Sequence, residues 1–445
     1  MKRLAIAAAI ALQALGGAAA GHVMLDGSLS GSQVYPGTER TYQVYVPKQY
    51  TGSEPACLYV GLDGVLCNAP AVIDSLIAVG KMPVTIAIFL QPGVIKNAQG
   101  EVVRYNRSNE FDMTTGTFAH FLESEVLPAV EGRSTPDGRV IHLSRRAQDH
   151  AIFGLSSGGI AAFTAAWQRP DLFGRVFSGV GTFVSMRGGN DLQMMVRKSE
   201  PKPIKICLQD GTRDAWNPLF GHWYEGNRML ASALDFAGYD TKYDWSDCTH
   251  GVKRASEIFA DVMTWLWQGW PAPIATGTTQ NDLLRPLLDA GSHWQQGKAK
   301  GAAARKVEHS ATYPDGSLLV EPIAGSNCLQ QSVIVNGKKA YTQPFYWLDS
   351  YDNAQLQVGG MAYDDKGNLW VVTSAGIQVL DQNGRVRGIL NLPRGAGDAT
   401  QLAITILQDG TVTLTRCGSA PCTWQRHFNV APATPGQRPK SQGQG

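Results

Sequence analysis

One short stretch, residues 154–158 (GLSSG), constrains this chain more than any other. The apolar run 150–153 leads into it, and the alanine-rich segment 161–166 follows it. A buried strand, a cramped turn and a small-residue helix are the context of a nucleophile elbow, in which a strained turn presents a serine. The two glycines let strand and helix press against the backbone of that turn. The stretch therefore predicts Ser156 as a nucleophile, with the amide end of a helix directed at its oxygen.

Apolar runs alternate with helical patterns on both sides of the turn. The run 41–47 alternates and is expected to be an antiparallel edge strand. We expect buried strands at 57–62, 84–90, 150–153, 175–179, 204–208 and 242–245. We expect helices from Thr117 to about residue 126, at 228–237 and at 255–267. Strands that alternate with helices are typical of an α/β fold, here a mostly parallel sheet covered on both faces.

Two further polar loops follow predicted strands, where the ligands of such sheets bind. Residues 209–217 carry Asp210 and Asp214, and residues 246–251 carry Asp247 and His250. The order serine, acid, histidine is that of an α/β-hydrolase. An imidazole takes the proton of the serine hydroxyl, and a carboxylate orients that imidazole. We predict Ser156, Asp214 and His250 as the catalytic residues, with Asp210 and then Asp247 as alternatives for the acid.

The oxyanion of such a reaction needs two backbone donors. One is expected to be the amide of Ser157, and the other is expected from the loop 63–66, with Val65 as the favoured residue. Asp63 is then expected to hold this loop through local amides.

These pieces together resemble the esterase branch of the α/β-hydrolases that holds enterochelin esterases, feruloyl and acetyl-xylan esterases and esterase D. The resemblance spans about residues 28–268, and the order of the motifs and the sequences of the loops are most similar to the enterochelin-esterase type. The matching segments are 35–40 (YPGTxR), 62–64 (LDG), 107–112 (RSxEFD), 154–159 (GLSSGG), 170–173 (PDLF), 211–214 (GTRD) and 249–251 (THG). The resemblance implies the same triad and no cofactor, and it places Arg107 and Glu110 near the substrate pocket. As an alternative, these two residues form an internal ion pair that holds their loop.

Aromatic residues follow the predicted acid in the chain. Trp216, His222, Trp223 and Tyr224 are candidates for a substrate-binding wall that stacks a phenolic acyl group, or else for core aromatics.

The chain changes character after residue 270. Residues 271–308 are expected to be a linker with a short helix at 283–288, and residues 309–433 an all-β domain. Aspartate-glycine turns lead into alternating strands at 314–320, 365–371 and 408–414, with a spacing typical of propeller blades. Residues 360–381 resemble a blade of the gluconolactonase propellers, which are metal-dependent lactonases. The region is too short for their closed ring, so we expect a truncated, partial propeller and no metal site, with Asp364 or Asn327 at most a vestige.

The two ends of the chain differ from its middle. Residues 1–20 have the basic start, apolar core and small-residue end of a secretory signal, with an uncleaved anchor as the alternative. We therefore place the esterase domain at 21–270 and expect a secreted or periplasmic protein without stable membrane insertion after cleavage. Residues 434–445 are expected to be a disordered tail.

Seven cysteines in an oxidising compartment allow up to three disulfides, for which Cys417 and Cys422 are the best local pair. Two further possible pairs lie near the proposed site: Cys207 with Cys248, and Cys57 with Cys67. No pair of cysteines or histidines has zinc-site spacing. The formal charge of +2 carries no basic block, so nucleic acid is not an implied partner.

The sequence thus predicts an exported serine esterase that acts on a small-molecule or carbohydrate ester, namely a siderophore trilactone or a feruloyl or acetyl ester of a plant polysaccharide. Three alternatives stay open: a metal-dependent lactonase in the second domain, a catalytically silent binding protein, and an acyltransferase.

Overall fold

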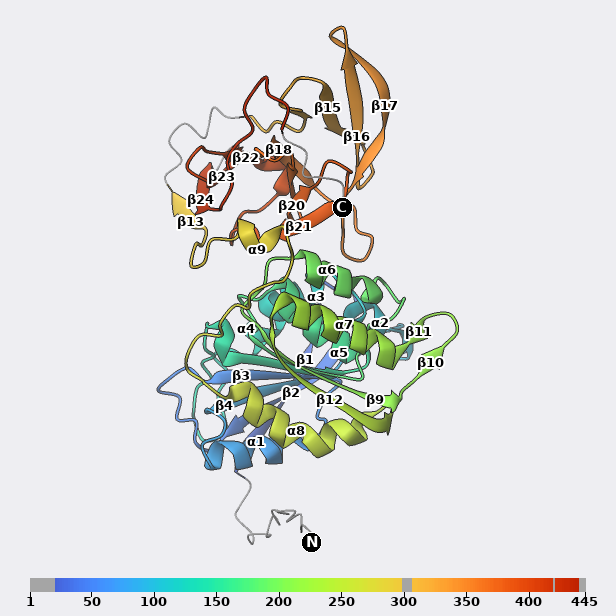
Figure 1. Ribbon diagram of the computed structural model, residues 1–445. Helices are drawn as coiled ribbons and strands as arrows, with labels where there is room; N and C mark the ends of the chain where they lie inside the picture. The colour runs from blue at the N-terminus through green and yellow to red at the C-terminus, as the bar shows by residue number, and fades with distance from the viewer. Residues whose placement is uncertain (1–20, 298–305, 419–420, 440–445) are drawn as a thin grey trace, which may run out of the picture.

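The computed structural model describes residues 21–297, 306–418 and 421–439, which form a lower α/β body and an upper all-β part (Figure 1). The predicted signal, residues 1–20, and the last six residues of the predicted tail lie outside this range. Among the described residues, no helix is long and apolar enough to cross a membrane.

The lower body is built on one eight-stranded sheet in the order β1-β2-β4-β3-β7-β8-β9-β12. Every neighbouring pair from β4 to β12 is parallel, whereas β1 and β2 run antiparallel. The strands are β1 (His22–Leu29), β2 (Arg40–Pro47), β3 (Cys57–Leu62), β4 (Thr85–Leu90), β7 (His150–Leu155), β8 (Arg175–Gly179), β9 (Lys205–Arg213) and β12 (Asp240–Thr249). The expected α/β class is confirmed. β1 was not predicted, and because it pairs along the whole of β2, the edge strand is β1 and not β2.

Helices cover both faces of the sheet, as Figure 1 shows: α1 and α8 lie on one face, and α3 to α7 lie on the other. They are α1 (Ala69–Ala78), α2 (Arg107–Phe111), α3 (Thr117–Phe121), α4 (Leu127–Val130), α5 (Ser157–Gln168), α6 (Leu192–Lys198), α7 (Trp223–Ala237) and α8 (Val252–Trp267). Strands β3, β4, β7 and β8 are buried throughout, since each face packs against its own apolar cluster. Burial on both faces explains why these strands read as continuous apolar runs.

The upper part holds three four-stranded antiparallel sheets. The first contains β14 (Ala311–Thr312), β15 (Leu318–Pro322), β16 (Cys328–Val335) and β17 (Lys338–Trp347). The second contains β18 (Val358–Tyr363), β19 (Leu369–Thr373), β20 (Gly376–Leu380) and β21 (Val386–Leu390). The third contains β22 (Leu402–Ile406), β23 (Thr411–Arg416), β24 (Cys422–His427) and β13 (Gln295–Gly297).

The three predicted aspartate-glycine turns take equivalent places in these sheets. Each one joins an edge strand of its sheet to the neighbouring strand, and its glycine, Gly316, Gly367 or Gly410, has a positive φ of 78–82°. The loose sequence repeat is therefore a repeat of structure, with one turn of this kind in each sheet.

The segment expected as a linker belongs in part to the upper body. Helix α9 (Leu284–Leu287) packs its two leucines into the core between the second and third sheets, and β13 adds a strand to the third sheet. The predicted short helix at 283–288 is thereby confirmed, and the segment also supplies β13, which was not predicted.

Ion pairs and hydrogen bonds join the two bodies. Arg426 of β24 pairs with Glu200 at 2.7 Å, with both side chains nearly buried. Lys198 pairs with Asp349 at 2.7 Å, and the indole of Trp167 donates to the hydroxyl of Tyr351. The upper body therefore packs on the helices of one sheet face.

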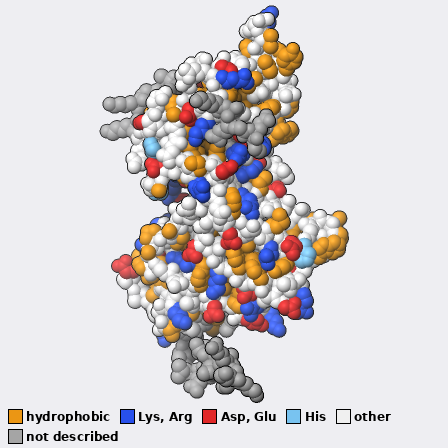
Figure 2. All heavy atoms as spheres, viewed as in Figure 1, with side chains coloured by type: hydrophobic (Ala, Val, Ile, Leu, Met, Phe, Trp, Pro, Cys, Tyr) orange, Lys and Arg blue, Asp and Glu red, His pale blue; other side chains and the backbone are white. Residues whose placement is uncertain are grey.

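The surface view shows charges of both signs interspersed over the face that it presents (Figure 2). Apolar side chains gather on the projecting β16–β17 hairpin, where Tyr341 and Trp347 are exposed.

Candidate active site

The nucleophile elbow forms as the sequence predicts. Ser156 lies between β7 and α5 with φ 58° and ψ −121°, a conformation that side-chain-bearing residues rarely adopt. A Cβ at position 154 would lie 2.1 Å from the carbonyl oxygen of Gly158, so only glycine fits there. The backbone of the turn therefore holds the serine side chain in place, at the carboxyl end of a central strand.

Three side chains from separate strand ends meet at this point. The Nε2 atom of His250 lies 2.9 Å from the Oγ atom of Ser156, and its Nδ1 atom lies 2.6 Å from the Oδ1 atom of Asp214. Asp214 directly follows β9, and His250 directly follows β12, its parallel neighbour. The structure thus brings the predicted serine, histidine and acid together in the geometry of a serine-hydrolase triad.

The three candidate acids have different surroundings. The Asp214 side chain is fully buried against His250. Burial opposes its ionisation, but hydrogen bonds from His250, Asp210 and the Ala215 amide keep the pKa of Asp214 below its ordinary value. Asp247 is exposed and pairs with Arg213, and Asp210 lies behind Asp214 without a contact to the imidazole. Of the three candidate acids, only Asp214 has a carboxylate that contacts the His250 imidazole among the described residues.

The two expected oxyanion donors are free to bind a ligand. In the part of the chain that the structure describes, neither the amide of Ser157 nor that of Val65 donates to a protein acceptor. Ser157 is the first residue of α5, where amides lack partners within the helix. Val65 lies on the loop that follows β3, and β3 is the neighbour of β7 in the sheet. The Asp63 carboxylate of the same loop lies next to Gly158 of the elbow.

Arg107 and Glu110 do not pair with each other, contrary to the alternative considered above. Arg107 clamps Asp63 through two hydrogen bonds of 2.6 and 2.8 Å, so the loop is held by a guanidinium and not by local amides as we expected. Glu110 is fully buried and pairs with Arg40 through bonds of 2.5 and 2.9 Å. This placement gives Glu110 a structural role in place of the expected substrate contact.

The aromatic candidates divide into two kinds. Trp223 is buried, and its ring stands edge-on to the His250 ring with the centroids 6.1 Å apart. Trp216 is exposed and pairs with His222 across the small β10–β11 hairpin (Trp216–Asn217 and Gly221–His222). Tyr224 instead packs edge-on against Trp245. Trp223 therefore packs against the His250 imidazole, whereas the Trp216 side chain faces solvent.

Next to these aromatics lies a mainly apolar cavity of about 180 Å³. Its walls include Phe183, Phe220, His222 and Met229. The Nδ1 atom of His222 is buried and has no partner among the described residues.

Thr182 is a site residue that the sequence did not indicate. Its hydroxyl lies 3.4 Å from the Ser156 hydroxyl and accepts a hydrogen bond from the Trp223 indole. It follows β8 within an ordinary Gly-Thr-Phe stretch, so no local pattern marks it.

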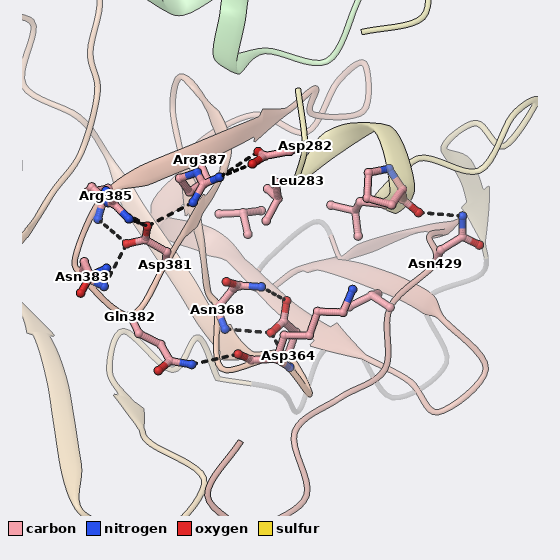
Figure 3. A pocket seen from close by; sticks show the side chains of 15 residues that line it. Asp282, Leu283, Asp364, Asn368, Asp381, Gln382, Asn383, Arg385, Arg387 and Asn429 are labelled. Atoms are coloured by element: carbon pink, nitrogen blue, oxygen red, sulfur yellow. Dashed lines mark hydrogen bonds and ion pairs between the residues drawn. The ribbon is translucent and has the colours of Figure 1, made fainter. Parts of the chain in front are cut away.

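The upper body holds a polar cavity of about 350 Å³, which Figure 3 shows between α9 and the second sheet. Asp364, one of the two expected metal-site vestiges, points into it. Its carboxylate accepts hydrogen bonds from the side chains of Asn368 and Trp370 and from two backbone amides. Asn327, the other, bonds to Ser350, Ala354 and Leu356. Both residues thus serve local structure, and the described residues contain no group of three or more side chains suited to a metal ion.

All seven cysteines are free thiols in the structure, including the expected local pair Cys417 and Cys422.

A mostly parallel sheet with a serine elbow and a histidine–carboxylate pair at its carboxyl edge defines an α/β-hydrolase of the serine type. The chain belongs to the family described as "Putative esterase", whose model matches residues 32–302.

Solved structures similar to this chain include esterases. An enterobactin esterase of Shigella flexneri is 21% identical, with a TM-score of 0.43 over 55% of this chain and 59% of that chain. A ferulic acid esterase is 19% identical, with a TM-score of 0.41 over 55% of this chain and 97% of that one. A fluorophosphonate-binding serine hydrolase of Staphylococcus aureus is 14% identical, with a TM-score of 0.38 over 55% and 98%. The match thus covers less than two thirds of the enterobactin esterase chain. A search of the curated proteins finds no match to this chain.

Proposed function

We propose that this chain is an exported serine ester hydrolase of the enterochelin-esterase type that uses Ser156, His250 and Asp214. The observation that carries the proposal is the continuous hydrogen-bonded arrangement from Ser156 Oγ through His250 to Asp214. Membership of an esterase family supports the same reaction class.

The mechanism follows from these positions. His250 Nε2 takes the hydroxyl proton as Ser156 Oγ attacks the ester carbonyl carbon, and the amides of Ser157 and Val65 bind the oxyanion that forms. The imidazolium then gives its proton to the leaving alkoxide, and an acyl-serine remains. A water molecule, deprotonated by His250, attacks this acyl group and releases the acid and the free serine. Asp214 holds the imidazole tautomer and stabilises its positive charge.

For the substrate we propose an ester that carries an aromatic ring, either a catecholate siderophore trilactone or a feruloyl ester of a polysaccharide, with acetyl esters of a polysaccharide as the alternative. The cavity that His222 lines supports this class because most of its wall surface is apolar, while His222, Gln193 and Glu225 add polar groups that can bond to a phenolic hydroxyl.

The first experiment compares the wild-type protein with S156A. We expect a fluorophosphonate probe to label the wild type and not the variant, and kcat to fall by about 10³-fold or more, as loss of a nucleophile does in such enzymes. The panel contains a feruloyl ester, an acetylated xylan, a short p-nitrophenyl ester and a catecholate trilactone. Activity that survives S156A but is lost with a chelator would instead support the lactonase alternative. Folded protein that never labels would support a binding role.

Export is proposed from the first twenty residues alone. Expression of the full chain in a Gram-negative host, followed by fractionation, tests it: we expect protein that starts near residue 21 in the periplasm or medium, and full-length cytoplasmic protein would contradict export.

A further inference from the structure

Asp210 and Asp214 bring two carboxyl groups together inside the protein. Asp210 is completely buried in the last part of β9, and its carboxyl group lies within hydrogen-bonding reach of that of Asp214. The triad mechanism uses Asp214 only. A second buried carboxyl group is costly to leave ionised, so its presence behind the triad needs a physical reason.

The hydrogen-bond partners of the four carboxyl oxygen atoms indicate that the pair holds a proton. Oδ1 of Asp214 accepts from His250 and from the Ala215 amide, and its Oδ2 is buried without an N–H or hydroxyl donor among the described residues. On Asp210, Oδ1 accepts from the Gly211 amide at 2.7 Å and Oδ2 from Asn227 at 2.6 Å. Ionised carboxylates only accept hydrogen bonds, so these two neighbouring carboxyl groups can bond to each other only if one of them carries a proton.

The surroundings favour Asp210 as the protonated partner. Asp214 faces the histidine that becomes cationic during the reaction, whereas no cation pairs with Asp210 in the described chain. Burial, together with the neighbouring Asp214 carboxylate, raises the pKa of Asp210 well above its ordinary value. A neutral carboxylic acid kept for hydrogen-bond donation has precedent in enzyme sites.

We propose that Asp210 is a neutral acid that donates a hydrogen bond to Oδ2 of Asp214 and so aims Oδ1 of Asp214 at His250. It is a positioning residue, and its role rests on the proposed serine-esterase function. Asn227 of α7 holds Asp210 in turn, since the same amide group also donates to the carbonyl oxygens of Gly181 and Trp223. The loop that carries Thr182 is thereby tied to the acid of the triad.

The test compares D210N with D210A in the full chain. An asparagine keeps a neutral N–H donor at this position, whereas an alanine leaves Oδ2 of Asp214 buried and unpaired. We expect kcat and the rate of fluorophosphonate labelling of D210A to fall about tenfold or more at unchanged KM, as loss of a hydrogen bond to a charged group predicts, and those of D210N to stay within about fivefold of wild type. Exposed Asp247 provides the matched control, and D247N should match the wild type.

A second measurement reads the proton directly. The infrared difference spectrum of wild type minus D210N at neutral pH should contain the carbonyl band of a protonated carboxylic acid, and a spectrum without that band would overturn the proposal. Equal loss in D210N and D210A would also overturn it, as would full activity in D210A, with folding verified by circular dichroism. A wild-type protein that does not label at all would refute the proposed function and leave the infrared test decisive for Asp210.

Discussion

Gly154 shows how much a single residue constrains this site. The carbonyl oxygen of Gly158 occupies the place that a side chain at position 154 would need. Gly154 lies in β7 and Gly158 in α5, so neither backbone segment is free to move. A flexible neighbour could move aside, but this one cannot.

We therefore predict that G154A lowers the free energy of unfolding by several kcal/mol, roughly the cost of overpacking a core, or prevents folding. Gly116 is the matched control, because a Cβ there meets only Gln168 at 3.6 Å. Urea denaturation of both variants measures the difference, and a stable G154A would contradict the assigned geometry of the elbow.

Glu110 gives a second prediction at the scale of the residue. Its pair with Arg40 is buried on both sides, so E110Q leaves a buried guanidinium without its counter-charge. We expect a loss of about 3–5 kcal/mol in the free energy of unfolding. The exposed pair of Lys96 and Glu39 is the control, and E39Q should cost about 1 kcal/mol or less. Near wild-type stability with a raised KM would instead place Glu110 at the substrate.

At the scale of the element, the loop after β3 must hold the Val65 amide in position while remaining open to the substrate. Arg107, at the start of α2, clamps the Asp63 carboxylate of this loop, and the amide of Gly64 donates to the carbonyl oxygen of Leu90. Arg107 also donates to the carbonyl oxygen of Leu155, directly before the nucleophile, at 3.3 Å, so α2 contacts both the loop and the elbow.

We predict that R107Q lowers kcat by about tenfold with little change in KM, because a displaced oxyanion donor weakens transition-state binding more than substrate binding. Steady-state kinetics on a p-nitrophenyl ester measures this. If D63N lowers kcat as much as R107Q does, and the double variant lowers it no further, the two residues act as one clamp. If the losses in the two single variants simply add in the double variant, the two residues act independently and the prediction is wrong.

At the scale of the whole molecule, Lys202 lies in the contact layer between the two bodies. Its ammonium group donates to the Trp167 carbonyl and lies 4.0 Å from the centre of that indole ring, which in turn bonds to Tyr351 of the upper body. Burial lowers the pKa of Lys202 to about 7, below its ordinary value of 10.5.

Between about pH 7 and pH 10.5, Lys202 of the unfolded chain binds a proton that Lys202 of the folded chain lacks. A rise in pH across this window should therefore stabilise the fold. Below about pH 7 both states are charged and the burial penalty is present in full. We expect K202M to be more stable than wild type at pH 6.5, by on the order of a few kcal/mol, and this gap to narrow by pH 9.5. Urea midpoints at both values measure it, with exposed Lys81 and K81M as the control. A gap that does not change with pH would contradict a neutral Lys202.

The amino-acid sequence by itself determined the elbow, the parallel sheet, the order of the triad residues and the three turn-and-strand repeats. These features are local: glycine spacing, apolar runs and strand-end loops record them within a few residues. Only the tertiary structure decided which carboxyl group faces His250, that Arg107 clamps Asp63, and that Glu110 holds Arg40. It also decided that β1 is the edge strand and that the Thr182 hydroxyl lies beside that of Ser156. Each of these contacts joins residues that are far apart in the chain or depends on which of two nearby carboxyl groups the packing buries, and no local pattern encodes such a pairing.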